Sequence, residues 1–126
     1  MNVEELLAQA RSRLERLDPH AARAAMDDGA LLLDIRSESQ RAADGVVPNA
    51  IFIARNVLEW RCDPASEWRD ERVPAGSRVI LMCDEGCQSS LAAATLRDLG
   101  VDATDLDGGF RAWQDAGLAV EPVPAG

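Results

Sequence analysis

The chain has 126 residues, of which 47% are apolar, and a formal net charge of −9. This length predicts one domain with a single core, over residues 1–126, and the negative charge disfavours nucleic acid and anionic membranes as partners because both are polyanions. All 13 basic residues are Arg, so the chain has no lysine for Schiff-base chemistry or for a phosphate clamp. No apolar stretch has the length of a membrane span, and the first residues lack the pattern of a signal peptide.

Three cysteines, Cys62, Cys83 and Cys87, are spaced unevenly along the chain. An odd number at such spacing does not indicate a disulfide scaffold, so we expect a reducing compartment and a cytoplasmic location. With a single His in the sequence, no zinc site is expected. The sequence predicts neither a metal nor an organic cofactor.

Apolar residues at helical spacing open the chain. Residues 1–17 predict an amphipathic helix that packs on the core or, alternatively, binds a partner. Asp18 and Pro19 are an N-cap followed by proline at the first helical position, so they predict a second helix, ending near Met26. His20 lies in the first turn of that helix, where a surface role is favoured over a catalytic Cys-His pair.

Short apolar segments then alternate with polar ones. Residues 30–35 predict a buried strand, and residues 38–43 predict a short helix after it, with Ser37 as its N-cap. Another short strand is expected at residues 50–53, followed by a helical turn at residues 57–60. Residues 61–77, rich in charge, Pro and Gly, predict a long irregular stretch that serves either as a binding surface or as a surface connection.

Cys83 lies between a predicted buried strand (79–82) and a predicted helix over residues 91–100, which closes on Gly100. In an open α/β sheet, ligands bind at the carboxyl ends of the strands. The loop is short and contains Gly86, so its backbone N–H groups can point back at the Cys83 sulfur. These donors and the positive end of the helix favour a thiolate.

The last elements continue the alternation of strand and helix. Residues 101–106 predict a strand, the Asp-Gly-Gly sequence at 107–109 predicts a sharp turn, and residues 110–116 predict a helix. Residues 120–126, with two prolines, predict a loose tail. Strands that alternate with helices indicate an α/β fold with a parallel sheet and helices on both faces.

Three segments make the chain resemble the single-domain rhodaneses, a family of sulfurtransferases. They are Leu-Leu-Asp-Ile-Arg at 32–36, a segment at 45–51 that is similar to the family's GHIPGA, and the C-terminal signature at 106–118. Together with the cysteine loop, the resemblance covers residues 16–121. It implies a five-stranded, mainly parallel sheet with helices on both faces. It also implies that Cys83 is the catalytic cysteine, which accepts a sulfane sulfur as a persulfide and passes it to a thiophilic acceptor.

The cysteine loop departs from the CxxGxR pattern common among active members of the family. Gly86 is present, but Gln88 stands where that pattern has Arg and offers only a neutral amide donor. Asp84 and Glu85 stand where thiosulfate-using members tend to carry positive charge. A carboxylate about 6 Å from the sulfur, at an effective dielectric constant of about 20, costs a dianionic donor several kcal/mol before screening. We therefore expect thiosulfate to be a poor donor.

Several side chains around Cys83 have two interpretations. Arg36 and Arg55 follow strands and either restore positive potential at the site or form structural ion pairs, the second being favoured. Cys87 either resolves a persulfide or forms a disulfide with Cys83, or it only fills space. Ser89 caps a helix or lines the pocket. The predicted substrate-binding residues are Asp84, Glu85, Gly86, Cys87, Gln88, Ser89, Arg36 and Arg55.

These observations favour a cytoplasmic sulfurtransferase that moves sulfur through a Cys83 persulfide, with a small thiol, persulfide or thiosulfate-type donor and a thiol acceptor or partner protein. The alternative is a non-catalytic module for regulation, redox sensing or protein binding, which the absence of the loop Arg favours. A phosphatase of the same fold needs a longer loop that ends in Arg, so this activity is disfavoured. The oligomeric state stays open.

Overall fold

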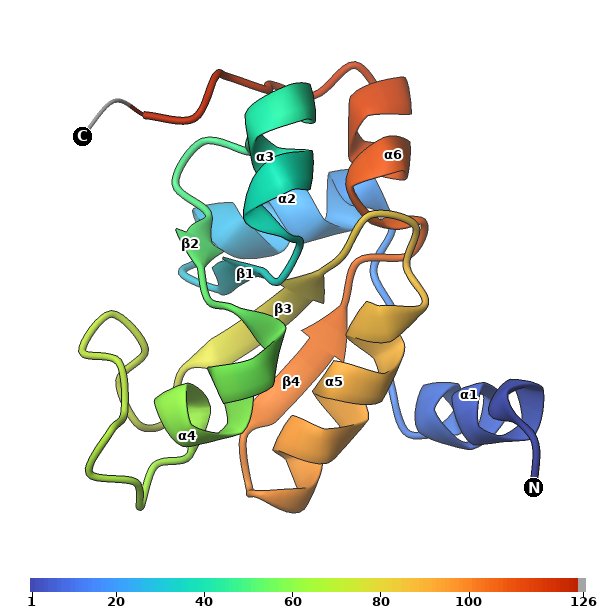
Figure 1. Cartoon of the computed structure of the whole chain (residues 1–126), viewed down its shortest axis with the longest axis vertical. Coiled ribbons are helices and arrows are strands. Elements are labelled where there is room, and N and C mark those ends of the chain that lie inside the picture. Colours follow the sequence, from blue (N-terminus) through green and yellow to red (C-terminus); the bar gives the residue numbers. More distant parts are fainter. Residues whose placement is uncertain (125–126) are drawn as a thin grey trace.

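Four short strands form one parallel sheet in the computed structural model, which describes residues 1–124 (Figure 1). The strands are β1 (Leu31–Asp34), β2 (Ile51–Phe52), β3 (Arg78–Met82) and β4 (Asp102–Asp105). Their order in the sheet is β2-β1-β3-β4, and every neighbouring pair is parallel. The parallel α/β architecture predicted from the sequence is thus confirmed, with β1, β2 and β4 shorter than predicted and β3 starting one residue earlier.

The expected fifth strand is reduced to a single bridge at the edge of the sheet. Leu17 pairs in parallel with Leu106, just after β4, and its N–H donates to the carbonyl of Asp105 at 3.1 Å. The pairing cannot continue because Asp18 caps helix α2 (Pro19–Asp27) immediately afterwards. The prediction of five strands was therefore wrong: the sheet has four.

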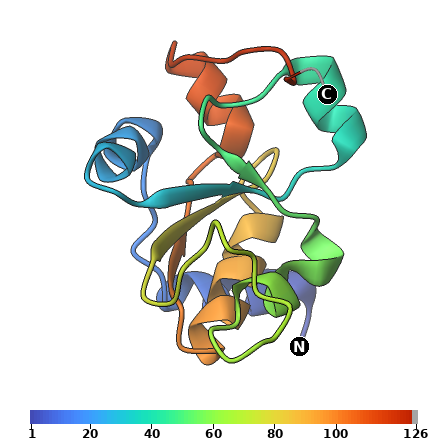
Figure 2. The same cartoon turned by 90° about the vertical axis from the view of Figure 1, so that its left-hand side faces the viewer.

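Helices cover both faces of the sheet (Figures 1 and 2). Besides α2, the helices are α1 (Val3–Ser12), α3 (Glu38–Asp44), α4 (Leu58–Cys62), α5 (Gln88–Asp98) and α6 (Gly109–Asp115), with a 3-10 turn at Arg55–Val57. Alternate strand residues reach opposite faces: Leu33 and Leu81 pack with α4 and α5, whereas Leu32 and Ile80 pack with α2 and α6. Each such buried side chain contributes roughly 1.5–3 kcal/mol to folding. Within residues 1–124 no helix is long and apolar enough to cross a membrane.

Helix α1 lies at one edge of the molecule and packs on α5 (Figure 1). The side chain of Asn2 caps it by accepting from the N–H of Glu5 at 2.8 Å. The helix ends at Ser12, five residues before the predicted end at Leu17, because the backbone of Leu17 pairs with the end of β4 instead. This shift brings the residues between helix and bridge next to the loop that follows β3.

The C-terminal tail is held at one point. Glu121 pairs with Val46 in an antiparallel bridge, with N–H to O distances of 2.7 and 2.8 Å. The prediction of a loose tail over 120–126 therefore fails at Glu121. Residues 125 and 126 lie outside the described residues.

The irregular stretch predicted over residues 61–77 begins at residue 63, because α4 continues to Cys62. It is organised around one carboxylate. Asp70 is almost completely buried and pairs with Arg72 at 2.7 Å and Arg61 at 3.1 Å. The hydrogen bond from Arg72 holds the pKa of Asp70 well below its ordinary value, against the opposing effect of burial.

Replacing this carboxylate should change the acid sensitivity of the protein. The unfolded Asp70 carboxyl protonates near pH 4, so its pairing stabilises the fold above that pH and the contribution is lost as the pH falls toward the lower folded pKa. We expect the free energy of unfolding to decrease from pH 7 to pH 3 in both proteins. The decrease should be about 1 kcal/mol smaller in Asp70→Asn than in the wild type. Denaturant titrations at both pH values measure this difference. Asp98→Asn, at the exposed partner of Arg13, is the control and should match the wild type; an unchanged pH dependence in Asp70→Asn would contradict the prediction.

Candidate active site

The Cys83 sulfur lies directly after β3, at the carboxyl end of a central strand. The loop after it curls back, so that the N–H groups of Gly86 and Ser89 donate to Sγ at 3.1 and 3.3 Å. Helix α5 begins at Gln88, which adds the positive end of its dipole on the same side. This arrangement stabilises negative charge on the sulfur.

Glycines allow the cysteine loop to touch the start of α6. Gly86 has φ of +92°, and a Cβ there would lie 2.8 Å from the backbone nitrogen of Gly108. A Cβ on Gly109 would lie 2.5 Å from the carbonyl oxygen of Cys83. The N–H of Phe110 donates to the same carbonyl oxygen at 2.9 Å. The Gly-Gly pair of the C-terminal signature therefore supports the Cys83 loop by close backbone contact.

An open pocket of about 320 Å³ lies over Cys83. Its other lining residues are Ile35, Arg36, Ser37, Gln40, Asp84, Glu85, Cys87 and Gln88. The structure thus brings five of the predicted substrate-binding residues to the pocket, while Gly86 and Ser89 lie beside the sulfur as N–H donors. Arg55 is not among the lining residues.

Besides Ile35, the pocket contains two polar side chains that the sequence did not predict there, Ser37 and Gln40. The side chain of Gln40 accepts from the N–H of Ser37 at 3.1 Å, and the Ser37 hydroxyl accepts from the N–H of Gln40 at 3.1 Å. The S-x-x-Q spacing predicts this capping box. Only the packing of α3 above the sheet shows that the cap faces Cys83.

The two carboxylates of the loop differ in their environments. Asp84 pairs with Arg111, whose Nε lies 3.2 Å from Oδ2, and Arg111 also pairs with Asp44. Asp84 and Asp44 raise the pKa of Arg111 above its ordinary value. Glu85 is exposed and forms no ion pair within residues 1–124. The negative charge at the mouth of the pocket is therefore mainly that of Glu85.

Both candidate arginines form ion pairs. Arg36 is buried, pairs with Asp34 at 2.9 Å and lies over the ring of Phe110, 3.9 Å from its centroid. Its Nη1 is buried and has no hydrogen-bond partner within residues 1–124. Arg55 pairs with Glu59 at 2.9 Å, one turn further along the chain. Arg36 thus combines a structural ion pair with a place at the pocket, whereas Arg55 has only the ion pair.

The three cysteines are free thiols in different surroundings. Cys87 is exposed, and its Sγ lies 3.9 Å from Nη2 of Arg11. Cys62 is buried; burial, followed by the charges of Asp70 and Glu59, raises the pKa of its thiol to about 11. Cys62 is therefore a poor nucleophile at neutral pH. Within residues 1–124 no group of His, Cys, Asp or Glu side chains is arranged to hold a metal ion.

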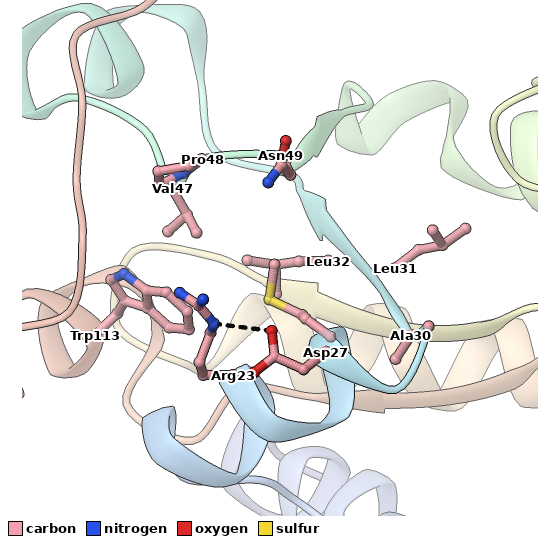
Figure 3. A pocket seen from close by; sticks show the side chains of 11 residues that line it. Arg23, Asp27, Ala30, Leu31, Leu32, Val47, Pro48, Asn49 and Trp113 are labelled. Atoms are coloured by element: carbon pink, nitrogen blue, oxygen red, sulfur yellow. Dashed lines mark hydrogen bonds and ion pairs between the residues drawn. The ribbon is translucent and has the colours of Figure 1, made fainter.

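A second cavity, of about 290 Å³, lies near the amino end of β1, between α2 and Trp113 of α6 (Figure 3). An ion pair between Arg23 and Asp27, 3.3 Å apart, lies beside it. Its lining residues include no Cys, Ser or His. The pocket over Cys83, with its nucleophile and N–H donors, is therefore the candidate active site.

Comparison with known families agrees with this arrangement. Residues 18–116 match the family described as Rhodanese-like domain. The chain belongs to this family, which confirms the resemblance found in the sequence. A comparison with curated proteins finds no match.

Solved structures share the fold. A protein of unknown function from Rhodopseudomonas palustris, described as a possible tyrosine phosphatase, is 30% identical over 96% of this chain and 95% of its own, with a TM-score of 0.87. Thiosulfate sulfurtransferase from Pseudomonas aeruginosa is 26% identical over 86% of this chain, with a TM-score of 0.71, and the match spans 19% of its own length. A rhodanese-related protein from Thermoplasma volcanium matches 84% of this chain and 96% of its own at 21% identity, with a TM-score of 0.69.

Proposed function

We propose that the protein is a sulfurtransferase in which Cys83 carries a sulfane sulfur as a persulfide. The observation that carries this proposal is the pair of N–H groups, from Gly86 and Ser89, that donate to the Cys83 sulfur at the floor of an open pocket. Such donors stabilise a thiolate before reaction and a persulfide anion after it. Membership of the rhodanese-like family, and the sulfurtransferase from P. aeruginosa among the structural neighbours, support the same reaction class.

The reaction consists of two displacements at sulfur. The Cys83 thiolate attacks the sulfane sulfur of a donor persulfide; the new S–S bond forms as the donor's S–S bond breaks, and the donor leaves as a thiolate. Cys83 then carries the sulfur as a persulfide anion. An acceptor thiolate attacks the outer sulfur, forms its own persulfide and restores the Cys83 thiolate. No electrons are gained or lost overall, so these steps need no redox cofactor.

The charges around the pocket favour a persulfide, whose reacting group carries at most one negative charge, over thiosulfate, which carries two. Glu85 is an exposed carboxylate among the lining residues, and Gln88 is neutral. Arg36, the cation in the lining, is already paired with Asp34. A reacting group with two negative charges thus meets more repulsion than one with a single charge, although the pairing of Asp84 with Arg111 makes the penalty smaller than two unpaired carboxylates would impose.

Intact-mass spectrometry tests the proposal. The wild type, Cys83→Ser and Cys87→Ser are exposed separately to glutathione persulfide and to thiosulfate. We expect the wild type and Cys87→Ser to gain the mass of one sulfur from the persulfide, much less from thiosulfate, and Cys83→Ser to gain none. If neither donor adds sulfur to the wild type, the sulfurtransferase proposal is wrong and the non-catalytic module takes its place.

A phosphatase is the second candidate, because the neighbour from R. palustris is described as a possible tyrosine phosphatase. The segment from Cys83 to Ser89 contains no Arg to grip a phosphate in a bidentate manner, and it contributes two carboxylates. We therefore expect no Cys83-dependent release of phosphate from an aryl phosphate. Release that disappears in Cys83→Ser would favour the phosphatase instead.

A further inference from the structure

The loop that carries Cys83 is held from outside by two arginines of the N-terminal segment. Nη2 of Arg16 donates to the carbonyl of Gly86 at 2.8 Å, and Nη2 of Arg11 donates to the same oxygen at 3.0 Å. Nε of Arg11 also donates to the hydroxyl of Ser90 at 3.1 Å. Both arginines precede residue 18, where the match to the family begins. The rhodanese-like segment therefore receives part of its loop support from residues outside it.

A buried carboxylate connects these arginines to the sulfur. Asp105, at the end of β4, is completely buried and accepts from Nε of Arg16 at 2.9 Å. Its Oδ2 also accepts from the hydroxyls of Ser89 and Ser90, each at 2.8 Å. The N–H of Ser89 is one of the two donors to Cys83. Asp105 thus fixes the first turn of α5 relative to Arg16.

The hydrogen bonds from Arg11 and Arg16 to the Gly86 carbonyl affect the second donor to Cys83, the N–H of Gly86. Gly86 has φ of +92°. Because glycine lacks a Cβ, its backbone has more conformations available than that of any other amino acid. Two guanidinium groups on its carbonyl favour the conformation in which its N–H faces the Cys83 sulfur. Charge-assisted hydrogen bonds of this kind are stronger than neutral ones.

The two arginines differ in how their charge is balanced. Burial disfavours charge on Arg16, but the hydrogen bond and charge of Asp105, together with the charges of Asp107 and Cys87, outweigh it and raise the pKa of Arg16 above its ordinary value. Arg11 forms no ion pair within residues 1–124, so it adds a net positive charge beside the loop. The loop itself has Gln88 where the family pattern has Arg, whereas the Arg11 guanidinium, from another element, contacts the Gly86 carbonyl and the Ser90 hydroxyl.

We propose that Arg11 and Arg16 are positioning residues for Cys83: together with Asp105 they hold the loop so that the Gly86 and Ser89 N–H groups face the sulfur. The consequence for sulfur transfer rests on the proposed function. The consequence for the reactivity of the Cys83 thiol is independent of the proposed function, so the experiment measures this reactivity.

The experiment measures the second-order rate constant for alkylation of Cys83 by iodoacetamide at neutral pH. A protease that cleaves after Glu85 separates Cys83 from Cys87, so that mass spectrometry follows each thiol in the same sample. We expect Arg11→Gln and Arg16→Gln each to slow alkylation of Cys83 by about tenfold, the effect of losing the charge-assisted hydrogen bond to the Gly86 carbonyl. Arg11→Lys, which keeps the charge and a donor, should recover most of the rate.

Arg13→Gln is the matched control, because Arg13 lies between the two arginines and pairs with the exposed Asp98 at 2.6 Å. Its alkylation rate should equal that of the wild type. Arg16→Gln leaves the buried Asp105 without its cation and could therefore fail to fold. In that case the double variant Arg16→Gln/Asp105→Asn removes both charges. Arg11→Gln leaves Asp105 paired and tests the proposal independently. Folded Gln variants that react within about twofold of the wild type would overturn the positioning role.

Failure of this proposal is distinguishable from failure of the proposed function. Slower alkylation in the Gln variants of a protein that takes up no sulfur would support the positioning role and reject the sulfurtransferase. Unchanged alkylation in the Gln variants of a protein that does take up sulfur would reject the positioning role and support the sulfurtransferase.

Discussion

Gly86→Ala is expected to slow sulfur uptake by Cys83 by about a hundredfold, as the loss of a donor in an oxyanion hole does. An alanine Cβ at this position would lie 2.8 Å from the backbone nitrogen of Gly108 and 3.2 Å from Nη2 of Arg16. The positive φ of +92° adds strain for any L-residue. The loop must move to relieve both, and the N–H that donates to Sγ at 3.1 Å moves with it.

The rate of mass gain from glutathione persulfide measures this effect. Gly100→Ala is the matched control: Gly100 has φ of +83°, but a Cβ there meets nothing within 4 Å. It should lose about 1 kcal/mol of stability and keep its rate of sulfur uptake. Since both variants carry the backbone strain, a difference between them isolates the contact with the loop. Wild-type uptake by Gly86→Ala would show that the loop geometry does not control the reaction.

Asp34→Ala is expected to destabilise the protein by about 3–5 kcal/mol, the range found when one partner of a buried ion pair is removed. The Asp34 carboxylate is completely buried and accepts from Nη2 of Arg36 at 2.9 Å and from Nε of Arg41 at 3.2 Å. Arg36 is itself buried, so its charge would be left without a carboxylate. A domain of this size has a total stability of only about 5–15 kcal/mol.

Denaturant unfolding at neutral pH, followed by circular dichroism, measures the change. Glu59→Ala provides the comparison, because it breaks the pair with Arg55 in which both side chains are 29% exposed. Solvent screens that pair, so we expect a loss of at most about 1 kcal/mol. Equal losses in the two variants would contradict the distinction between fully buried and partly exposed ion pairs on which the prediction rests.

Local signals in the sequence predicted most of the secondary structure. Four-residue apolar runs marked β1 and β3, and the caps at Asp18 and Ser37 marked the starts of α2 and α3. These signals are reliable because a cap or a buried run depends on contacts within a few residues. The motif at 106–118 carried the family assignment, which the match to the rhodanese-like family confirms.

Where the prediction failed, the outcome depended on contacts between distant segments. The residues before Asp18 could continue a helix or join the sheet, and the pairing of Leu17 with Leu106 decided between the two. The same contact shortened α1, and the start of α2 directly after it limited the sheet to four strands. Periodicity within residues 1–17 contains no information about the free edge of β4.

The candidate site was also predicted only in part. The sequence alone determined the family, the parallel α/β fold and a cysteine followed by a glycine-containing loop between a buried strand and a helix, since these depend on neighbouring residues. Only the tertiary structure decided that Arg111 pairs with Asp84, and that Arg11 and Arg16 reach the Gly86 carbonyl from 75 and 70 residues away. In the sequence these arginines are indistinguishable from solvated charges on a helix face. Which carbonyl or carboxylate an arginine meets depends on how the elements pack, and no local pattern encodes that choice.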